Sequence, residues 1–141
     1  IAIEAAKSIS KLPVFASMAF DSIGEDFKTM MGVDVETAVS KIVSLGVDAV
    51  GFNCGKMSLE SYIRLAAKYA SAAHDSEQDV VLLAEPNAGL PELVEGQAIY
   101  KVPPADFAAA VEKIHSVGVS IIGGCCGTGP EHIEAAAKKL K

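Results

Sequence analysis

The feature of this sequence that most restricts its fold is an internal repeat with a constant offset of 72 residues. Residues 38–54 (AVSKIVSLGVDAVGFNC) align with residues 110–126 (AVEKIHSVGVSIIGGCC), and nine of the seventeen aligned pairs are identical. Each copy has the pattern of a helix that ends at a glycine, followed by a turn and an apolar strand that ends in cysteine. The repeat therefore predicts two equivalent helix-strand units, with Cys54 and Cys126 at corresponding positions.

Expected strands and helices alternate along the whole chain. We expect strands at residues 14–20, 47–53, 80–84 and 119–123. A helix end is expected within residues 1–11, and further helices begin near residues 34, 58, 103 and 130, with a loop at 21–33 and a small ribbon around 92–102. Because each strand is followed by a helix, the sequence predicts an α/β fold with a parallel sheet and right-handed crossovers.

Two parallel architectures fit this alternation, a doubly wound sheet and a (β/α)₈ TIM barrel. The repeat lies two units apart along the chain, which suits a barrel, because alternate barrel strands supply equivalent layers of side chains. A complete barrel needs about 250 residues. A chain of 141 residues therefore predicts roughly the second half of a barrel.

The three cysteines of the chain all follow the ends of expected strands. Cys54 ends one strand, Cys125 and Cys126 end the last, and Asn87 follows the strand between them. Adjacent cysteines are poorly placed for a disulfide with each other, and an odd number does not indicate a secreted disulfide framework. Catalytic groups of barrels lie at the C-terminal ends of strands, so the pattern favours a metal or catalytic site.

The last expected helix begins directly after the adjacent cysteines. Thr128 and Glu131 have the spacing of a capping box, with Pro130 in the first turn. Unpaired N–H groups at the start of this helix favour thiolate over thiol. The three histidines fall on polar helix faces or ends, so we expect His74, His115 and His132 to be solvated surface residues.

The charge balance limits the possible partners of the chain. Its formal net charge of −6 argues against nucleic acid and against anionic membrane surfaces. No apolar run approaches the roughly 18 residues that span a bilayer. We therefore expect a soluble, cytoplasmic protein with no nucleic-acid and no membrane partner. Because the chain begins at Ile1 without methionine or a signal-like segment, we also expect it to be a piece of a longer protein.

Three segments of the chain resemble the homocysteine S-methyltransferase family. They are GFNC at residues 51–54, EPNAG at 85–89 and GGCCGTGPEH at 123–132. The first expected strand and the EPNAG loop are most similar to the homocysteine-binding module of cobalamin-dependent methionine synthases. The resemblance implies that residues 1–141 are strands five to eight of the barrel with their helices. The N-terminal half would be absent, so the missing half or a second copy of the chain is an expected partner.

The resemblance also implies a site and a reaction. Zinc would be held by Cys54, Cys125 and Cys126, with homocysteine as the fourth ligand and substrate. The methyl donor would be methylcobalamin. Its cobalamin would be bound by another module, and its methyl group would come from methyltetrahydrofolate. Asn87 would fill the fourth metal position in the absence of substrate, while Glu85 and Asp21 would hold the amino group of the substrate.

Other interpretations of the same residues stay open. The cysteines can form a structural zinc site in a non-catalytic half-barrel fragment, or they can be buried free thiols or a redox pair. Asn87 can simply form a turn, Glu85 can make a helix-cap or loop hydrogen bond, and Asp21 competes with other acids in its loop. The donor can also be betaine or S-methylmethionine, as in relatives of this domain.

Overall fold

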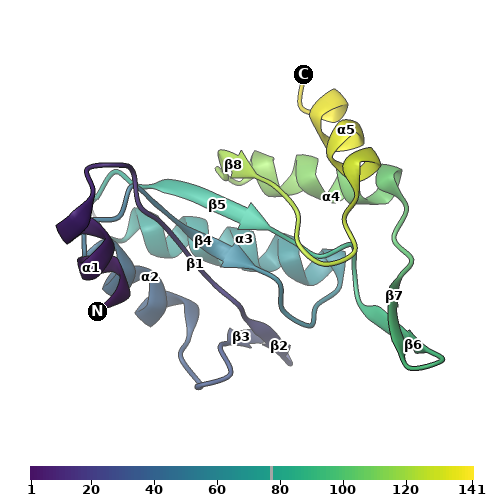
Figure 1. The fold of residues 1–141 in the computed structure, drawn as a ribbon, viewed down its shortest axis with the longest axis horizontal. Helices are drawn as coiled ribbons and strands as arrows, with labels where there is room; N and C mark the ends of the chain where they lie inside the picture. Colours follow the sequence, from purple (N-terminus) through teal and green to yellow (C-terminus); the bar gives the residue numbers. More distant parts are fainter. Residues whose placement is uncertain (77) are drawn as a thin grey trace.

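Four parallel strands form the central sheet of the protein, which we describe from a computed structural model covering residues 1–76 and 78–141. The strands, in their order across the sheet, are β1 (Phe15–Met18), β4 (Ala49–Asn53), β5 (Val81–Glu85) and β8 (Ile121–Ile122). Their spatial order is their chain order (Figure 1). Within the described residues the sheet lacks the reversal of order found in doubly wound folds, and it is compatible with half a barrel.

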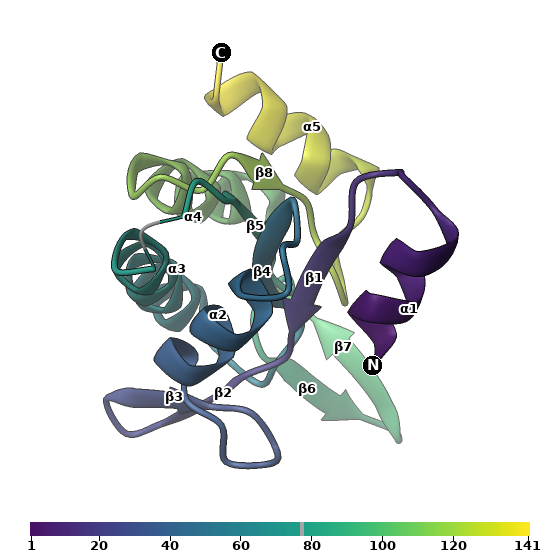
Figure 2. The same ribbon diagram turned by 90° about the vertical axis from the view of Figure 1, so that its left-hand side faces the viewer.

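Helices connect these strands and cover one face of the sheet. In the described part of the chain the helices are α1 (Ala2–Ile9), α2 (Val35–Val43), α3 (Leu59–His74), α4 (Pro104–Ser116) and α5 (Pro130–Lys139). Figure 2 shows α2, α3 and α4 on the same side of the sheet. The four helices α2 to α5 begin where the sequence predicts. At two of these starts the side chains of Asp34 and Ser58 cap the helix, accepting hydrogen bonds from the N–H groups of Thr37 and Ser61.

The hydrophobic core lies between the sheet and these helices. Val50 of β4 is in register with Leu82 of β5, and Phe52 with Ala84, so these four buried side chains share one face. The aromatic residues of α3 pack on them, with the ring of Tyr62 stacked on Phe52 at a centroid distance of 6.2 Å. This packing fixes β4 and β5, whose C-terminal ends carry candidate site residues.

Among the described residues, no helix that connects two strands of the sheet lies on its opposite face (Figure 2). Phe15, Ala49 and Val81 are in register on this face, and the side chains of Phe15 and Val81 are 53% and 42% exposed. A closed barrel buries the equivalent face in its interior. The exposed apolar residues indicate that this face is suited to burial against further structure.

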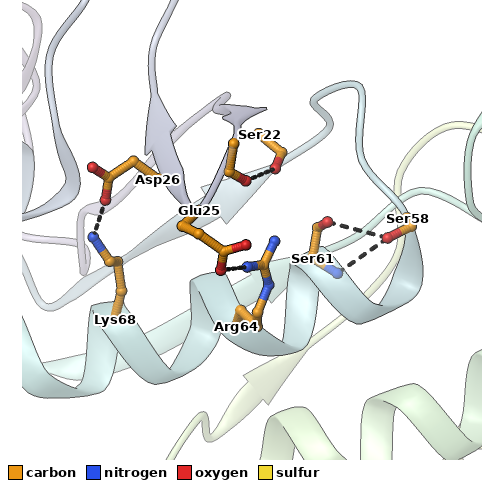
Figure 3. Close-up of polar contacts among 8 residues, drawn as sticks. Ser22, Glu25, Asp26, Ser58, Ser61, Arg64 and Lys68 are labelled. Carbon is orange, nitrogen blue, oxygen red and sulfur yellow. Dashed lines mark hydrogen bonds and ion pairs between the residues drawn. The ribbon is translucent and has the colours of Figure 1, made fainter.

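A hairpin occupies part of the segment predicted as a loop at residues 21–33, so that prediction was wrong. Strands β2 (Asp21–Ile23) and β3 (Asp26–Lys28) pair antiparallel. Figure 3 shows that Glu25 and Asp26 face α3, where they form ion pairs with Arg64 (2.7 Å) and Lys68 (2.6 Å). The strands are only three residues long, too short for the period-2 pattern that identifies a strand in sequence.

A second hairpin confirms the ribbon expected around residues 92–102. Strands β6 (Pro91–Val94) and β7 (Gln97–Tyr100) pair antiparallel. Glu95 and Gly96 form its turn with positive φ angles of 50° and 81°, as a type I′ turn requires. This hairpin links the EPNAG loop after β5 to α4.

The start of α5 differs from the predicted capping box. Gly129 is the N-cap, and its N–H group donates to Nδ1 of His132 at 3.1 Å. The hydroxyl of Thr128 instead donates to the carbonyl of Cys125. Among the helices of residues 1–76 and 78–141, none combines the length and the apolar character needed to cross a membrane.

Candidate metal centre

Three sulfur atoms meet at the C-terminal edge of the sheet. Cys54 follows β4, and Cys125 and Cys126 lie in the turn between β8 and α5. The Sγ atom of Cys126 lies 3.7 Å from that of Cys54 and 3.9 Å from that of Cys125. All three sulfur atoms lie within 4.8 Å of one another. The structure thus brings together the cysteines that the sequence predicts as a group.

The geometry and chemistry of this group fit a zinc ion. A tetrahedral site with Zn–S bonds of about 2.3 Å places its sulfur atoms roughly 3.8 Å apart, close to the observed separations of 3.7 and 3.9 Å. Thiolates are the ligands that a borderline-soft cation prefers. Within the described part of the chain no histidine or carboxylate joins the cluster. Three protein ligands are typical of catalytic zinc, which keeps one position open.

The last residue of β5 and the segment after it hold both cysteine loops by backbone hydrogen bonds. The N–H of Cys54 donates to the carbonyl of Glu85 at 3.1 Å, and the N–H of Cys125 donates to that of Pro86 at 2.9 Å. In return, Ala88 donates its N–H to the carbonyl of Cys126 at 2.9 Å. Because these bonds extend the pairing of neighbouring strands, the sheet itself fixes the positions of the thiols.

The loop after Cys54 needs a glycine. Gly55 has a φ of 89°, and a Cβ atom at this residue would lie 2.0 Å from the carbonyl oxygen of Phe20. The hydroxyl of Tyr62 donates to the carbonyls of Cys54 (2.9 Å) and Gly55 (3.1 Å). The sequence suggested only a core position for Tyr62; its hydroxyl also fixes the loop that carries the first thiol.

Asn87 is buried and lies between the two cysteine loops, with only 2% of its surface exposed. Its Nδ2 donates to the carbonyl of Gly55 at 2.9 Å, and its Oδ1 accepts from the N–H of Cys126 at 3.0 Å. The side chain therefore bridges the loops that carry the thiols. Its predicted roles as a substrate-binding residue and as a fourth metal ligand stay predictions.

The two acidic candidates lie beside the cysteine loops. Glu85 is half-buried at the end of β5, and its Cγ lies 3.6 Å from the position that a Cβ on Gly123 would take. Asp21 is exposed, and its Oδ1 accepts from the N–H of Lys56 at 2.8 Å. Each acid thus contacts a residue two positions from a cysteine in the sequence, and their roles in holding a substrate amino group stay predictions.

The cysteine thiols differ in acidity. Burial raises the pKa of Cys54, but hydrogen bonds with Cys126, the Gly55 amide, Cys125 and Asn87 outweigh this effect, so that its pKa lies below the ordinary value. The pKa of Cys125 is raised to about 11 by burial, by its hydrogen bond with Cys126 and by the charge of Cys54. Cys54 therefore ionises before Cys125, and a divalent cation would favour loss of the remaining protons.

His132 was predicted to be a solvated surface residue, and the structure shows that this was wrong. Only 6% of its surface is exposed. Its Nδ1 accepts from Gly129, its Nε2 lies 2.9 Å from the carbonyl of Val102, and its ring meets the edge of Phe107 at 5.5 Å. Since Nδ1 is an acceptor, Nε2 carries the proton and donates. His74 and His115 are exposed, as expected.

Comparisons with known proteins agree with this arrangement. A family model described as homocysteine S-methyltransferase matches residues 1–140. The chain is 33% identical over 129 residues to a protein named methionine synthase from Mycobacterium leprae (strain TN), and equally to one of the same name from Mycobacterium tuberculosis (strain ATCC 25618 / H37Rv). Each match covers 89% of this chain and 10% of the relative. The chain thus spans about a tenth of the length of these relatives.

Proposed function

Because this chain belongs to the homocysteine S-methyltransferase family, we propose that it is a homocysteine-binding segment of a zinc-dependent S-methyltransferase. Residues 1–141 would be the C-terminal half of a (β/α)₈ barrel domain, with β1, β4, β5 and β8 as its strands five to eight. The observation that supports this proposal most strongly is the convergence of three thiols within 4.8 Å of one another at the C-terminal edge of the sheet. Barrel enzymes place their chemistry at this edge.

The residues that would hold zinc are Cys54, Cys125 and Cys126. When bound, zinc supplies the Lewis acidity that lowers the pKa of a coordinated thiol, so that homocysteine is held as a thiolate near neutral pH. Asn87 and Tyr62 keep the cysteine loops in place through their hydrogen bonds. The chain thereby provides three charged ligands and leaves the fourth position to the substrate.

Carboxylates beside the cysteine loops suit the amino group of homocysteine. Glu85 lies beside Gly123 and Asp21 beside Lys56, so either acid lies close to one of the cysteine loops. A half-buried carboxylate pairs with an ammonium group more strongly than an exposed one, since solvent screens it less. Between the two, the half-buried Glu85 is the better candidate for this contact.

The proposed reaction transfers a methyl group to the homocysteine sulfur. The thiolate attacks the methyl carbon and forms an S–C bond. The bond between the methyl carbon and the donor breaks, and its electron pair stays on the donor. Methylcobalamin on another module, replenished from methyltetrahydrofolate, is the proposed donor. The resemblance of the EPNAG loop to methionine synthase modules supports this choice over betaine or S-methylmethionine.

The open face and edges of the sheet support a proposal about assembly. Strands β1 and β8 are the outer strands of the four-stranded sheet, and exposed edges and apolar faces promote association. We expect the N-terminal half of the barrel, or a second copy of the chain, to cover them. Light scattering of the isolated chain should therefore show self-association; a stable monomer at all concentrations would contradict this expectation.

Calorimetric titration of the zinc-loaded chain tests whether the site selects a thiol. Homocysteine should bind with release of a proton. Homoserine, which has a hydroxyl in place of the thiol, should bind with an affinity lower by at least roughly 100-fold, because zinc prefers thiolate. The zinc-free chain is the control and should not distinguish the two amino acids. Equal affinity for both amino acids in the zinc-loaded chain would contradict the proposed function.

A further inference from the structure

The buried imidazole of His132 lies at the start of α5, shortly after the adjacent cysteines. Burying a polar ring lowers stability unless its nitrogen atoms find hydrogen-bond partners. Both ring nitrogens have one, because Nδ1 accepts from the N–H of Gly129 at 3.1 Å and Nε2 donates to the carbonyl of Val102 at 2.9 Å. The imidazole therefore joins two backbone segments that are far apart in the sequence.

The bond to Gly129 fixes the end of the cysteine turn, which we define as residues 125–129. The carbonyl of Gly129 in return accepts from the N–H of His132 at 3.0 Å, so these two residues are bonded in both directions. The preceding residue, Thr128, donates its N–H (3.3 Å) and its hydroxyl (2.6 Å) to the carbonyl of Cys125. The position of the imidazole is thus passed along the backbone to the residue that begins the turn.

The bond to Val102 holds a second segment against the same turn. Tyr100 lies two residues before Val102, and a Cβ atom at Gly127 would lie 2.2 Å from Cγ of Tyr100. The tyrosine ring therefore packs directly on the backbone of the cysteine turn. A Cβ atom on Gly89 would lie 2.4 Å from Cγ2 of Val102, so the EPNAG loop lies against this segment as well. One hydrogen bond from His132 thereby anchors a segment that packs on both loops.

We propose, building on the proposed function, that His132 is a positioning residue for the metal centre. Asn87 fixes the two cysteine loops relative to each other, whereas His132 fixes the backbone of the turn that carries two of the three thiols. A tetrahedral centre accepts only a narrow range of sulfur positions. A turn that is held less firmly should therefore bind the metal more weakly, even in a folded chain.

Three substitutions separate the two hydrogen bonds of the imidazole. His132→Phe keeps an aromatic ring beside Phe107 and removes both bonds. His132→Asn keeps an acceptor for the N–H of Gly129, because its amide oxygen is attached to Cγ, as Nδ1 is in histidine. His132→Gln carries its amide one bond further out, so it keeps a donor for the carbonyl of Val102 and loses the acceptor for Gly129.

Cobalt(II) is the probe for this test, since its ligand-field bands depend on the arrangement of its ligands. We expect His132→Phe to bind cobalt roughly 10-fold more weakly, the lower end of the range for residues that support metal ligands, and to change the intensity of these bands. His132→Asn should restore most of the affinity and the bands, because it keeps the bond nearer to the cysteines. His132→Gln should restore less of both.

Two control variants distinguish positioning from a general loss of stability. Phe107→Leu removes the edge contact of its ring with the imidazole, at a centroid distance of 5.5 Å, and leaves both hydrogen bonds of His132 in place. It should lower the midpoint of thermal unfolding and leave cobalt binding unchanged. His115→Phe removes an imidazole whose Nδ1 also lies 2.9 Å from a backbone carbonyl, that of Val119. Val119 precedes β8 and the cysteines follow it, so this variant should also keep its cobalt affinity.

The outcomes separate this inference from the proposed function. Wild-type cobalt affinity in a folded His132→Phe chain would overturn the role of His132, and so would equal losses in His132→Phe and Phe107→Leu. If His132→Phe does not fold, the two amide variants decide, and binding by His132→Gln as tight as by His132→Asn would overturn the role. In these cases the proposed function stands. If the unmodified chain binds no cobalt through its thiols, the proposed function fails, and the inference about His132 fails with it.

Discussion

Replacing Cys126 by serine is expected to remove zinc from the protein almost completely. Its sulfur lies within 4 Å of both other cysteine sulfurs, so it is central to the cluster. A serine hydroxyl stays protonated near neutral pH and is a poor zinc ligand. Changes in residues that merely support zinc ligands cost 10–100-fold in affinity, and loss of a ligand should cost more than about 100-fold.

The zinc content of the purified chain measures this effect. Elemental analysis after dialysis against a weak chelator should find close to one zinc per wild-type chain and almost none per Cys126→Ser chain. His74→Ala is a suitable control, because it removes an exposed imidazole that the structure places in no metal cluster. That variant should keep its zinc. A Cys126→Ser protein that is folded and retains a full equivalent would contradict the three-thiol centre.

Replacing Asn87 by alanine is expected to lower both zinc affinity and stability. The change removes the bridge between the cysteine loops and leaves the Gly55 carbonyl and the Cys126 N–H without their partner. A buried polar group left unpaired costs roughly 1–3 kcal/mol. Because the two loops then move independently, we expect a loss of about 10–100-fold in zinc affinity, as for other residues that support metal ligands.

The chain offers a matched control for this change. Asn53 is the other asparagine, and it lies at the end of β4, where its Oδ1 accepts from the hydroxyl of Ser17 at 2.8 Å. Asn53→Ala removes the same chemical group without breaking a contact between the cysteine loops. Competition with a chromogenic chelator should show weak binding for Asn87→Ala and near wild-type binding for Asn53→Ala. Equal affinities for the two variants would show that the bridge is unimportant.

The strand pattern and the cysteine cluster could be predicted from sequence because both follow from local regularities. Parallel strands buried beneath helices leave long apolar runs, and their carboxyl ends meet at one edge of the sheet. Cys54 and Cys126 occupy equivalent places in a repeated unit, so any fold that places the repeats in one sheet brings them to the same edge. The strand order and the short sulfur distances agree with this reasoning.

The contacts that support the cluster could not be predicted, because they join segments with no common periodicity. His132 lies near the polar start of a helix, and its burial depends on Val102 and Phe107, which come from another part of the chain. Tyr100 reaches Gly127 only because a hairpin inserted after β5 folds back over the turn. Side chains that act across a tertiary contact leave no pattern in their own sequence neighbourhood.

The β2–β3 hairpin escaped prediction for a related reason. Its strands are short, and its attachment to α3 depends on Arg64 and Lys68, which lie about forty residues away in the sequence. Exposed ion pairs of this kind contribute only about 0–1 kcal/mol each, but the buried ring of Phe27 adds apolar contact with the same region. The hairpin also carries Asp21, so this attachment decides where that carboxylate lies relative to the thiols.

X-ray absorption at the zinc edge tests most directly whether the chain holds a metal with three sulfurs and an open position. In the zinc-loaded protein, the first shell should contain three sulfur atoms at about 2.3 Å and one lighter atom. Addition of homocysteine should raise the sulfur number to four and remove the lighter atom. A shell that is already closed by four protein ligands and does not change with homocysteine would contradict the account.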